Sequence, residues 1–361
     1  MSGFRVDAGM EIGGEAKPSF QEDPREVVPR FREAVVRWFE EEGRSFPWRE
    51  TEDPYAILVS ELMLQQTRVE TVLQRNFFGR WMEAFPTMET LAQASEEEIL
   101  KCWEGLGYYR RARFLQKAAQ AVVDQYGGTF PSRHEEILAL PGVGAYTAGA
   151  VSAFAFNRAA PMVDGNVARV LTRLFDSKLS IDDTEGKRRL EDWSAELVDP
   201  QRARLFQSGI MELGQVICRA RKPLCGQCPV SSFCQTREPE TLPRKKKSAK
   251  PVEVDEWVYW VKEGDKVFLE EEDGSRRRGL YRLPQTDPAQ GRGREILLSQ
   301  RYAITKYKVT MRVVEGHAED VTEREGKWCG ASEREAVALG APYRRVLETL
   351  LQREAEGDLF S

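Results

Sequence analysis

The chain has 361 residues, of which 41% are hydrophobic and 31% are charged, and its formal net charge is −5. This length predicts two or three domains, and the composition is that of a folded, water-soluble chain. No run approaches the roughly 20 apolar residues of a membrane-spanning helix, and the first 24 residues lack the basic start and apolar stretch of a secretory signal. We therefore expect a cytoplasmic (nucleoid-associated) protein that does not engage a membrane and that begins with a disordered leader over residues 1–24.

The negative net charge conceals basic patches. Residues 315–361 contain 11 acidic and six basic residues, so they account for the whole net charge and the rest of the chain is neutral. A basic patch can neutralise phosphate groups, although any single patch is more often a solvated surface. The patches are Arg110, Arg111 and Arg113; Arg219, Arg221 and Lys222; residues 244–247; and residues 276–278.

Histidine is nearly absent, since the chain contains only His134 and His317. Zinc sites with several histidines, and serine or cysteine nucleophiles activated by histidine, need residues that this chain does not have. If the protein is an enzyme, carboxylates must carry the proton transfers.

Residues 25–235 have helical periodicity and predict an all-α domain. Segments rich in Gly and Pro, such as LPGVG, separate the helical stretches. Apolar residues recur at helical spacing in residues 27–43, 57–85, 96–106, 111–126 and 166–175.

The composition and the hydrophobic pattern of the sequence change after residue 235. Residues 236–252 are rich in Pro and Lys and predict an exposed linker. Residues 253–356 contain β-forming runs at WVYWV, KVFLE and KVTMRVV and end in the helical segment PYRRVLETLLQRE. We expect a multidomain chain in which a small α+β domain follows the helical one.

Four cysteines lie close together in the sequence, with the spacing C-x6-C-x2-C-x5-C over residues 218–234. Because nothing indicates export, thiolate ligation of a metal is favoured over disulfides. A structural zinc is the alternative, but the unequal gaps favour an iron–sulfur cluster. The four ligands would be Cys218, Cys225, Cys228 and Cys234.

Two further motifs contain residues suited to binding and proton transfer. In LPGVGAYT, Gly142 and Gly144 allow a tight turn whose free amides would bind phosphate at a helix N-terminus, although a plain interhelical turn fits this segment equally well. Asp164, in VDGNVARV, stands where a helix N-cap is the commonest role. Glu61, in SELMLQQT, lies beside the apolar stripe of its helix, where a solvated surface position is commoner than a cleft.

The cysteine spacing, together with the LPGVGxxT and VDGNVxRV segments that precede it, resembles the endonuclease III branch of the helix-hairpin-helix DNA glycosylases. The resemblance covers the helical half. It implies that the four cysteines hold a structural 4Fe-4S cluster, which shapes a basic loop toward DNA. The basic residues of that loop would be Arg219, Arg221 and Lys222.

SELMLQQT resembles the adenine DNA glycosylases more than any other branch of this superfamily. The resemblance implies hydrolysis of the glycosidic bond of adenine mispaired with 8-oxoguanine or guanine in double-stranded DNA, by a protein expected to be monomeric. Glu61 would protonate the adenine, a poor leaving group as an anion, and Asp164 would stabilise the oxocarbenium ion. Tyr146 and Asn166 would orient water and Asp164. Because Tyr146 replaces the Schiff-base lysine of the endonuclease III branch, a monofunctional hydrolase is favoured.

The same resemblance assigns residues that handle the DNA. A glycosylase must extrude its base and fill the gap, and the wedge roles fall to Gln66 and Tyr108. The adenine pocket would include Trp48 and Arg49. The hairpin glycines, with Arg110, would contact the DNA backbone.

The C-terminal domain resembles the Nudix-like module that reads oxidised guanine in this family, through GLYRLP at residues 279–284. Two departures from the family pattern predict weakened base discrimination. Ile304, Thr305 and Lys306 stand where the family carries a Phe-Ser-His reading loop. Ser208 replaces a Gln or Glu that contacts the adenine, and the neighbouring Gln207 is a candidate substitute.

Two alternatives stay open. The Ser208 change favours a glycosylase for another base, such as thymine opposite guanine or hypoxanthine. A DNA-damage binding protein with an iron–sulfur cluster and no catalysis is the other alternative. Retention of both Glu61 and Asp164 argues against it, because binding alone needs neither carboxylate near the phosphates.

Overall fold

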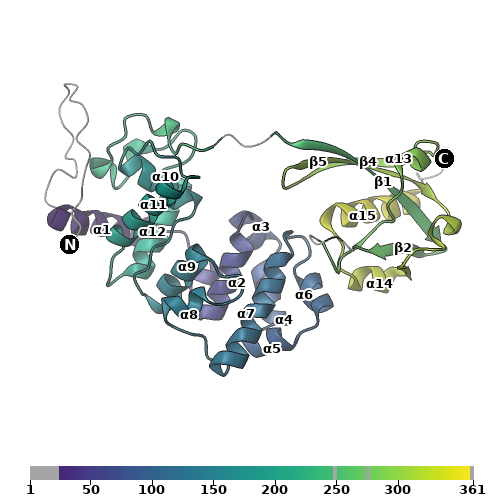
Figure 1. The fold of residues 1–361 in the computed structure, drawn as a ribbon, viewed down its shortest axis with the longest axis horizontal. Coiled ribbons are helices and arrows are strands. Elements are labelled where there is room, and N and C mark those ends of the chain that lie inside the picture. The colour runs from purple at the N-terminus through teal and green to yellow at the C-terminus, as the bar shows by residue number, and fades with distance from the viewer. Residues whose placement is uncertain (1–23, 247–249, 273, 275–276, 358–361) are drawn as a thin grey trace. The chain divides into compact units, whose positions relative to one another are not determined.

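The computed structural model describes residues 24–246, 250–272, 274 and 277–357 (Figure 1). Residues 1–23 of the leader expected over residues 1–24 therefore lie outside the described residues. The chain forms two compact units. The first unit comprises Met1–Leu62 and Asp124–Lys247, and the second comprises Met63–Val123 and Ser248–Ser361. In the part of the chain that is described, no helix combines the length and apolar character needed to cross a membrane.

The first unit is helical, as the apolar periodicity predicts. Its core is formed by the apolar faces of its first helix and its last three long helices, with Phe31, Leu171 and Phe206 almost completely buried. Aromatic edge contacts from Phe31 to Phe206 and Phe233 join the two ends of the unit. Its elements are α1 (Pro24–Glu42), η1 (Pro47–Arg49), most of α2 (Pro54–Leu64), α8 (His134–Leu138), α9 (Ala145–Phe156), α10 (Gly165–Leu174), α11 (Thr184–Leu197), α12 (Ala203–Val216), η2 (Cys225–Gln227), η3 (Ser231–Phe233) and η4 (Pro239–Thr241).

The second unit begins with short helices where the periodicity indicated one continuous helical stretch over residues 57–85. The helix breaks at Gln66 and at Asn76, which have φ angles of 59° and 48° and therefore leave the right-handed helical region. Trp81 and Trp103 pack edge to face at the centre of this part, and both are fully buried. The helices are α3 (Val69–Gln74), α4 (Phe77–Ala84), α5 (Met88–Gln93), α6 (Glu96–Cys102) and most of α7 (Arg110–Tyr126).

The C-terminal part of the second unit is built on a six-stranded mixed sheet (Figure 1). The strand order is β3-β2-β1-β5-β4, with β6 also paired to β2; β1 and β5 are parallel, and the other pairs are antiparallel. Strands β1, β2 and β5 and the final helix lie where the sequence predicts them. The elements are β1 (Val252–Glu263), β2 (Lys266–Glu271), β3 (Tyr281–Arg282), α13 (Pro288–Gly291), β4 (Ile296–Ile304), β5 (Tyr307–Gly316), η5 (Ala318–Val321), β6 (Gly326–Cys329), α14 (Ala331–Ala336) and α15 (Ala341–Glu356).

Successive residues of β1 belong to different cores, because side chains alternate across a strand. Val258 and Trp260 pack in the core that includes Tyr343 of α15, whereas Trp257 and Tyr259 belong to a second cluster. The sheet therefore buries residues on both of its faces.

Within the second unit, polar contacts tie the C-terminal part to the segment between α6 and α7. The Arg344 guanidinium binds the carboxylate of Glu104 through two nitrogens, at 2.5 and 3.1 Å. The Tyr109 hydroxyl donates to the Leu339 carbonyl at 3.2 Å, and both residues are buried. These contacts explain why Met63–Val123 groups with the C-terminal residues.

Candidate active site

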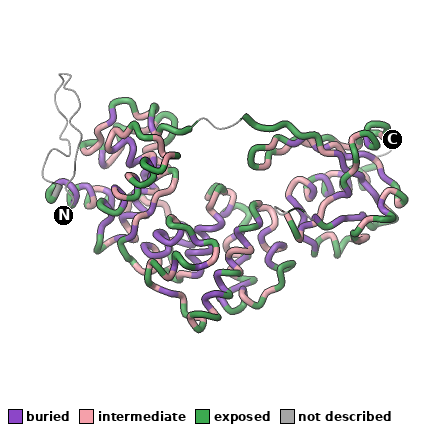
Figure 2. Tube along the Cα trace, viewed as in Figure 1, coloured by how far each residue is buried: buried purple, intermediate pink, exposed green. Residues whose placement is uncertain are grey.

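Glu61 is buried, so the solvated surface position considered from the sequence is wrong. It is 5% exposed, on a helix whose residues from Tyr55 to Met63 are all buried (Figure 2). Burial raises the pKa of Glu61 from its ordinary value of 4.5 to about 7, and the nearby charge of Asp164 adds to the rise. A hydrogen bond from the Tyr146 hydroxyl and the positive charge of Arg49 oppose it. Glu61 can therefore hold or release a proton near neutral pH.

Tyr146 reaches Glu61 from the first turn of α9, directly after the hairpin that joins α8 and α9. Gly142 adopts a φ of +79°, which favours glycine, and Gly144 is the N-cap of α9. No side chain caps this helix, and both glycines are exposed, so backbone amides at the N-terminus of α9 face outward. The pKa of Tyr146 lies well above its ordinary value, because burial and the charges of Glu61 and Asp164 disfavour the phenolate. Tyr146 is therefore a hydrogen-bond donor rather than a base.

Asp164 is both the N-cap of α10 and a member of the carboxylate cluster. Its Oδ1 accepts hydrogen bonds from the Asn166 and Val167 amides at 2.9 and 2.7 Å, and its Oδ2 accepts from Asn166 Nδ2 at 2.7 Å. Burial raises the pKa of Asp164, while these hydrogen bonds and the charge of Arg169 oppose the rise and favour the ionised form. The structural role and a second chemical role are thus compatible.

Two glycines allow the helices that carry these groups to approach closely. A Cβ at Gly149 of α9 would lie 2.2 Å from the Pro161 carbonyl oxygen, and a Cβ at Gly214 of α12 would lie 2.8 Å from the Asn166 Cβ. Any larger residue would push α9 away from the segment before Asp164, or α12 away from the start of α10. The fold therefore brings Glu61 and Tyr146 together with Asp164 and Asn166, from three segments that lie far apart in the sequence.

Arg49 is held beside this cluster by Glu212, a residue that no sequence motif indicated. Glu212 is fully buried, and its Oε2 accepts a hydrogen bond from Arg49 Nη2 at 3.0 Å, while Arg44 binds the other oxygen. Trp48 stacks on Phe46 with ring centroids 5.4 Å apart. The only sequence signal was an acidic residue within the apolar segment LFQSGIMELG.

Gln207 and Ser208 are both buried on α12. The Gln207 side-chain amide donates to the Ala160 carbonyl at 2.9 Å. A new contact from that nitrogen to a base would have to replace this hydrogen bond.

The cysteine loop folds back on itself around Cys228. Burial is the largest cause of the raised pKa of the Cys228 thiol, and the thiols of Cys218, Cys234 and Cys225 raise it further. The other three thiols of the loop therefore lie near Cys228. Among the described residues, no three His, Cys, Asp or Glu side chains are placed to hold a single metal ion. Thiolates are the usual ligands of an iron–sulfur cluster, and this loop holds four cysteines, none of which forms a disulfide.

Two arginines of α10 hold the start of this loop. Arg173, only 1% exposed, donates to the sulfur of Cys218 at 3.3 Å and to the Arg219 carbonyl at 2.7 Å. Arg169 donates to the Cys218 carbonyl at 2.7 Å and to Asn166 Oδ1 at 2.9 Å. A continuous chain of hydrogen bonds therefore runs from Asp164 through Asn166 and Arg169 to the first cysteine.

The remaining predicted DNA contacts are exposed. Arg219, Arg221 and Lys222 have exposed side chains in the cysteine loop of the first unit. In the second unit, Gln66, Tyr108 and Arg110 are exposed near the ends of α2 and α7. Thr305 and Lys306 form the exposed two-residue turn of the β4–β5 hairpin, where Ile304 pairs with Tyr307.

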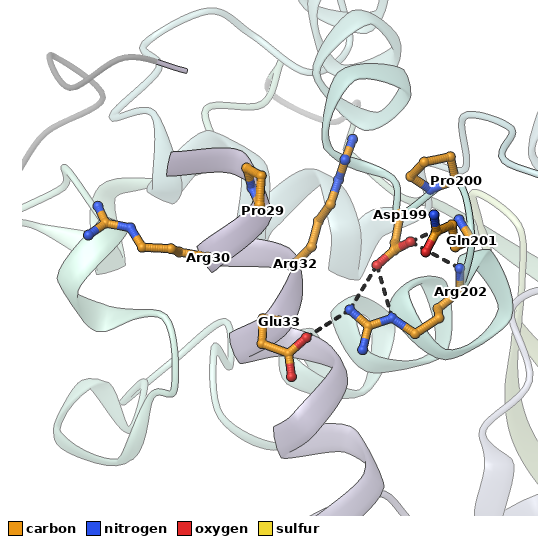
Figure 3. A pocket seen from close by; sticks show the side chains of 8 residues that line it. All are labelled: Pro29, Arg30, Arg32, Glu33, Asp199, Pro200, Gln201 and Arg202. Atoms are coloured by element: carbon orange, nitrogen blue, oxygen red, sulfur yellow. Dashed lines mark hydrogen bonds and ion pairs between the residues drawn. The ribbon is translucent and has the colours of Figure 1, made fainter. Parts of the chain in front are cut away.

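A separate surface pocket of about 470 Å³ lies between α1 and the segment that precedes α12 (Figure 3). Arg202 Nη2 binds Glu33 at 2.8 Å and Asp199 at 3.0 Å, so these charges are already paired. None of the predicted site residues lines this pocket.

Two family models match the chain. The model of the HhH-GPD superfamily base excision DNA repair proteins matches residues 59–196, and the model of the iron–sulfur binding domain of endonuclease III matches residues 218–234. The second match covers all four cysteines, so this loop is an iron–sulfur binding domain.

Several curated relatives are named adenine DNA glycosylase. The human protein is 44% identical over 220 residues, which cover 58% of this chain and 40% of its own length. The protein of Mycolicibacterium smegmatis (strain ATCC 700084 / mc(2)155) is 40% identical over 205 residues, covering 56% of this chain and 68% of its own length. The chain thus spans about two fifths of the human relative and about two thirds of the mycobacterial one.

A similar solved structure is that of a thermostable thymine-DNA glycosylase. It matches with a TM-score of 0.53 and 32% identity, covering 58% of this chain and 96% of that one. Together with the mycobacterial relative and the two family models, this match places the helical fold and the cysteine loop in one superfamily. The chain belongs to the adenine DNA glycosylase family within the HhH-GPD superfamily of base excision DNA repair proteins.

Proposed function

We propose that this protein is a monofunctional DNA glycosylase that releases adenine mispaired with 8-oxoguanine or guanine. The observation that carries the proposal is the buried Glu61, whose pKa of about 7 lies close to the pH at which a general acid works best. Asp164 supplies the second carboxylate, and the names of the relatives support adenine as the base.

The reaction requires a proton donor and an anion at different positions. Glu61 in its acid form gives a proton to N7 of adenine as the C1′–N9 bond breaks, and the bonding electron pair leaves with the base. The sugar is left as an oxocarbenium ion, which the Asp164 carboxylate stabilises. Water then adds to C1′ and returns a proton to Glu61. Tyr146 donates to Glu61, and Asn166 donates to Asp164, so both carboxylates are held in place.

The partner of this reaction is double-stranded DNA, bound by one copy of the chain. The outward-facing amides at the N-terminus of α9 suit a phosphate group, because the helix dipole favours negative charge there. The exposed Arg219, Arg221 and Lys222 add positive charge beside the cluster. The 4Fe-4S cluster, held by the four cysteines, would fix the shape of this loop.

The C-terminal sheet region is proposed to be the Nudix-like module that reads the base opposite adenine. The β4–β5 hairpin supports this role, because its two-residue turn presents exposed side chains at the position of the family reading loop. Ile304, Thr305 and Lys306 lack the family histidine, so we propose that discrimination between 8-oxoguanine and guanine is weak.

A second candidate substrate is thymine opposite guanine. The match to a thermostable thymine-DNA glycosylase, which this chain covers almost completely, favours it, as does Ser208 in place of the family Gln or Glu. Hypoxanthine is a further alternative of the same kind.

Single-turnover base release tests both candidates. Duplexes would carry adenine opposite 8-oxoguanine, guanine or cytosine, with thymine–guanine and hypoxanthine duplexes in parallel at one fixed salt concentration. Fast adenine release supports the proposal, whereas release of thymine alone would move the protein to the second substrate. Binding without release of any base would indicate a damage-binding protein.

A further inference from the structure

Arg111 does not belong to a surface basic patch, although it lies between the charged residues Arg110 and Arg113. It is 7% exposed, whereas Arg110 is exposed. Burial lowers the pKa of Arg111 to about 10, so its guanidinium is still charged at neutral pH. A buried charge of this kind needs partners that satisfy its donors.

Arg111 binds backbone carbonyls of two segments, the end of α2 with the loop that follows it and the loop before α7. It also donates to the Thr67 hydroxyl at 3.5 Å. Its Nη1 donates to the carbonyls of Met63, at 3.1 Å, and Gln65. Its Nη2 donates to the carbonyls of Leu106 and Gly107, at 3.1 and 3.0 Å. One planar guanidinium therefore bridges the end of α2 and the start of α7 within the second unit.

Each loop carries a residue with an unusual backbone conformation directly after a carbonyl that Arg111 binds. Gln66 follows Gln65 and has a φ of 59°, and Tyr108 follows Gly107 and has a φ of 49°. Side chains other than glycine rarely adopt this region, and such strain persists only where surrounding contacts enforce it. Both side chains are exposed, so packing of their own does not explain the conformation.

The guanidinium also contacts the aromatic ring of one of these residues. It lies 5.5 Å from the ring centroid of Tyr108 and 5.3 Å from that of the buried Trp103. Arg111 thus restrains the Tyr108 side chain as well as the peptide bond before it.

We propose that Arg111 is a positioning residue that couples Gln66 and Tyr108, so that both enter the DNA as one rigid wedge when the base is extruded. This inference rests on the proposed function. Lysine cannot replace Arg111, because a single ammonium group lacks the planar fork that reaches both loops and stacks on the rings.

The test compares Arg111→Lys with Leu115→Ala, a matched control on the same helix. Leu115 is fully buried one turn along α7, and its truncation lowers stability without removing a hydrogen bond to either loop. The duplex carries 2-aminopurine beside an adenine opposite 8-oxoguanine, so fluorescence reports unstacking and single-turnover assays report release. All variants are compared well below their melting temperatures.

Arg111→Lys should reduce the fluorescence change and slow adenine release by about tenfold to a hundredfold. Leu115→Ala should leave both readouts within about threefold of the unchanged protein. In a Gln66→Ala/Tyr108→Ala background, Arg111→Lys should have little further effect, because there is no wedge left to position.

An equal effect of Arg111→Lys in both backgrounds would overturn the inference, as would an effect no larger than that of Leu115→Ala. Both results leave the proposed function intact. If the unchanged protein neither unstacks the reporter nor releases adenine, the proposed function fails, and the inference fails with it.

Discussion

The carboxylate site and the β4–β5 hairpin differ in how firmly the protein holds their side chains. Glu61 is almost fully buried and accepts a hydrogen bond from Tyr146. Asp164 accepts a hydrogen bond from the Asn166 side chain. Thr305 and Lys306 are exposed, and the Lys306 ammonium lies over the neighbouring Tyr307 ring. Substitution at the hairpin disturbs few contacts, whereas substitution at the carboxylate site disturbs several.

This difference suggests that bond cleavage and opposite-base reading can change independently. The carboxylates match the family motifs, while the hairpin departs from them at all three positions of the proposed reading loop. A buried polar cluster constrains each of its members through the others. An exposed two-residue turn imposes no such constraint, so its residues can vary without loss of the fold.

The largest expected effect follows from removing the proton donor. Glu61→Gln should slow single-turnover adenine release by roughly a thousandfold, because an amide cannot supply the proton that the leaving base needs. Glu70→Gln, at an exposed position on α3, is the control and should retain full activity. A Glu61→Gln variant that still releases adenine at a normal rate would contradict the assignment of Glu61 as the acid.

The same substitution should raise stability at alkaline pH. The folded-state pKa of Glu61 is about 7 and its ordinary value is 4.5, so the cost of ionising the buried carboxylate is absent below about pH 4.5. It grows as the pH rises and is complete above about pH 7. Glu61→Gln removes this cost, so its free energy of unfolding should gain up to roughly 3 kcal/mol relative to the unchanged protein at pH 8. Urea unfolding at pH 4 and pH 8 measures the difference, and a gain that does not increase with pH would contradict the buried-acid account.

The rate of base release should depend on pH in the direction set by Glu61. Only the protonated form acts, so above about pH 7 the single-turnover rate should fall by roughly tenfold per pH unit. DNA affinity, measured on a duplex with an uncleavable adenine analogue, is the control and should change less over the same range. A flat rate between pH 6 and pH 9 would mean that another group donates the proton.

The smallest effect is expected at the hairpin. Replacing Ile304, Thr305 and Lys306 together with Phe, Ser and His should raise the preference for adenine opposite 8-oxoguanine over guanine by about tenfold, since one or two new hydrogen bonds are gained. The melting temperature should stay nearly unchanged, because Thr305 and Lys306 are exposed. An unchanged preference would mean that this hairpin does not read the opposite base.

Short sequence motifs indicated the proposed catalytic residues but not the residues that support them. Glu61, Asp164 and the cysteines lie in short motifs, so their roles could be inferred from local patterns. Glu212 could not be found in this way, because its partner Arg49 lies 163 residues earlier in the chain. Arg111 does not belong to the surface patch predicted with Arg110 and Arg113, since its burial depends on loops that only the fold brings together.

The same reason explains the errors in the fold. Strands β1, β2 and β5 contain dense runs of β-forming residues and were predicted, whereas β3 has two residues and β4 has no fully buried position. No Gly or Pro marks the helix break at Gln66 in the sequence. In the structure, the distant Arg111 donates a hydrogen bond to the carbonyl of Gln65, directly before the break. Local periodicity cannot detect a break that a distant side chain enforces.

The most direct test of the account is the single-turnover rate of adenine release from a duplex with adenine opposite 8-oxoguanine, compared with the same duplex carrying guanine at that position. We expect fast release from both duplexes, at similar rates, and loss of release from both in Glu61→Gln. Absence of adenine release alongside thymine release from a thymine–guanine duplex would contradict it.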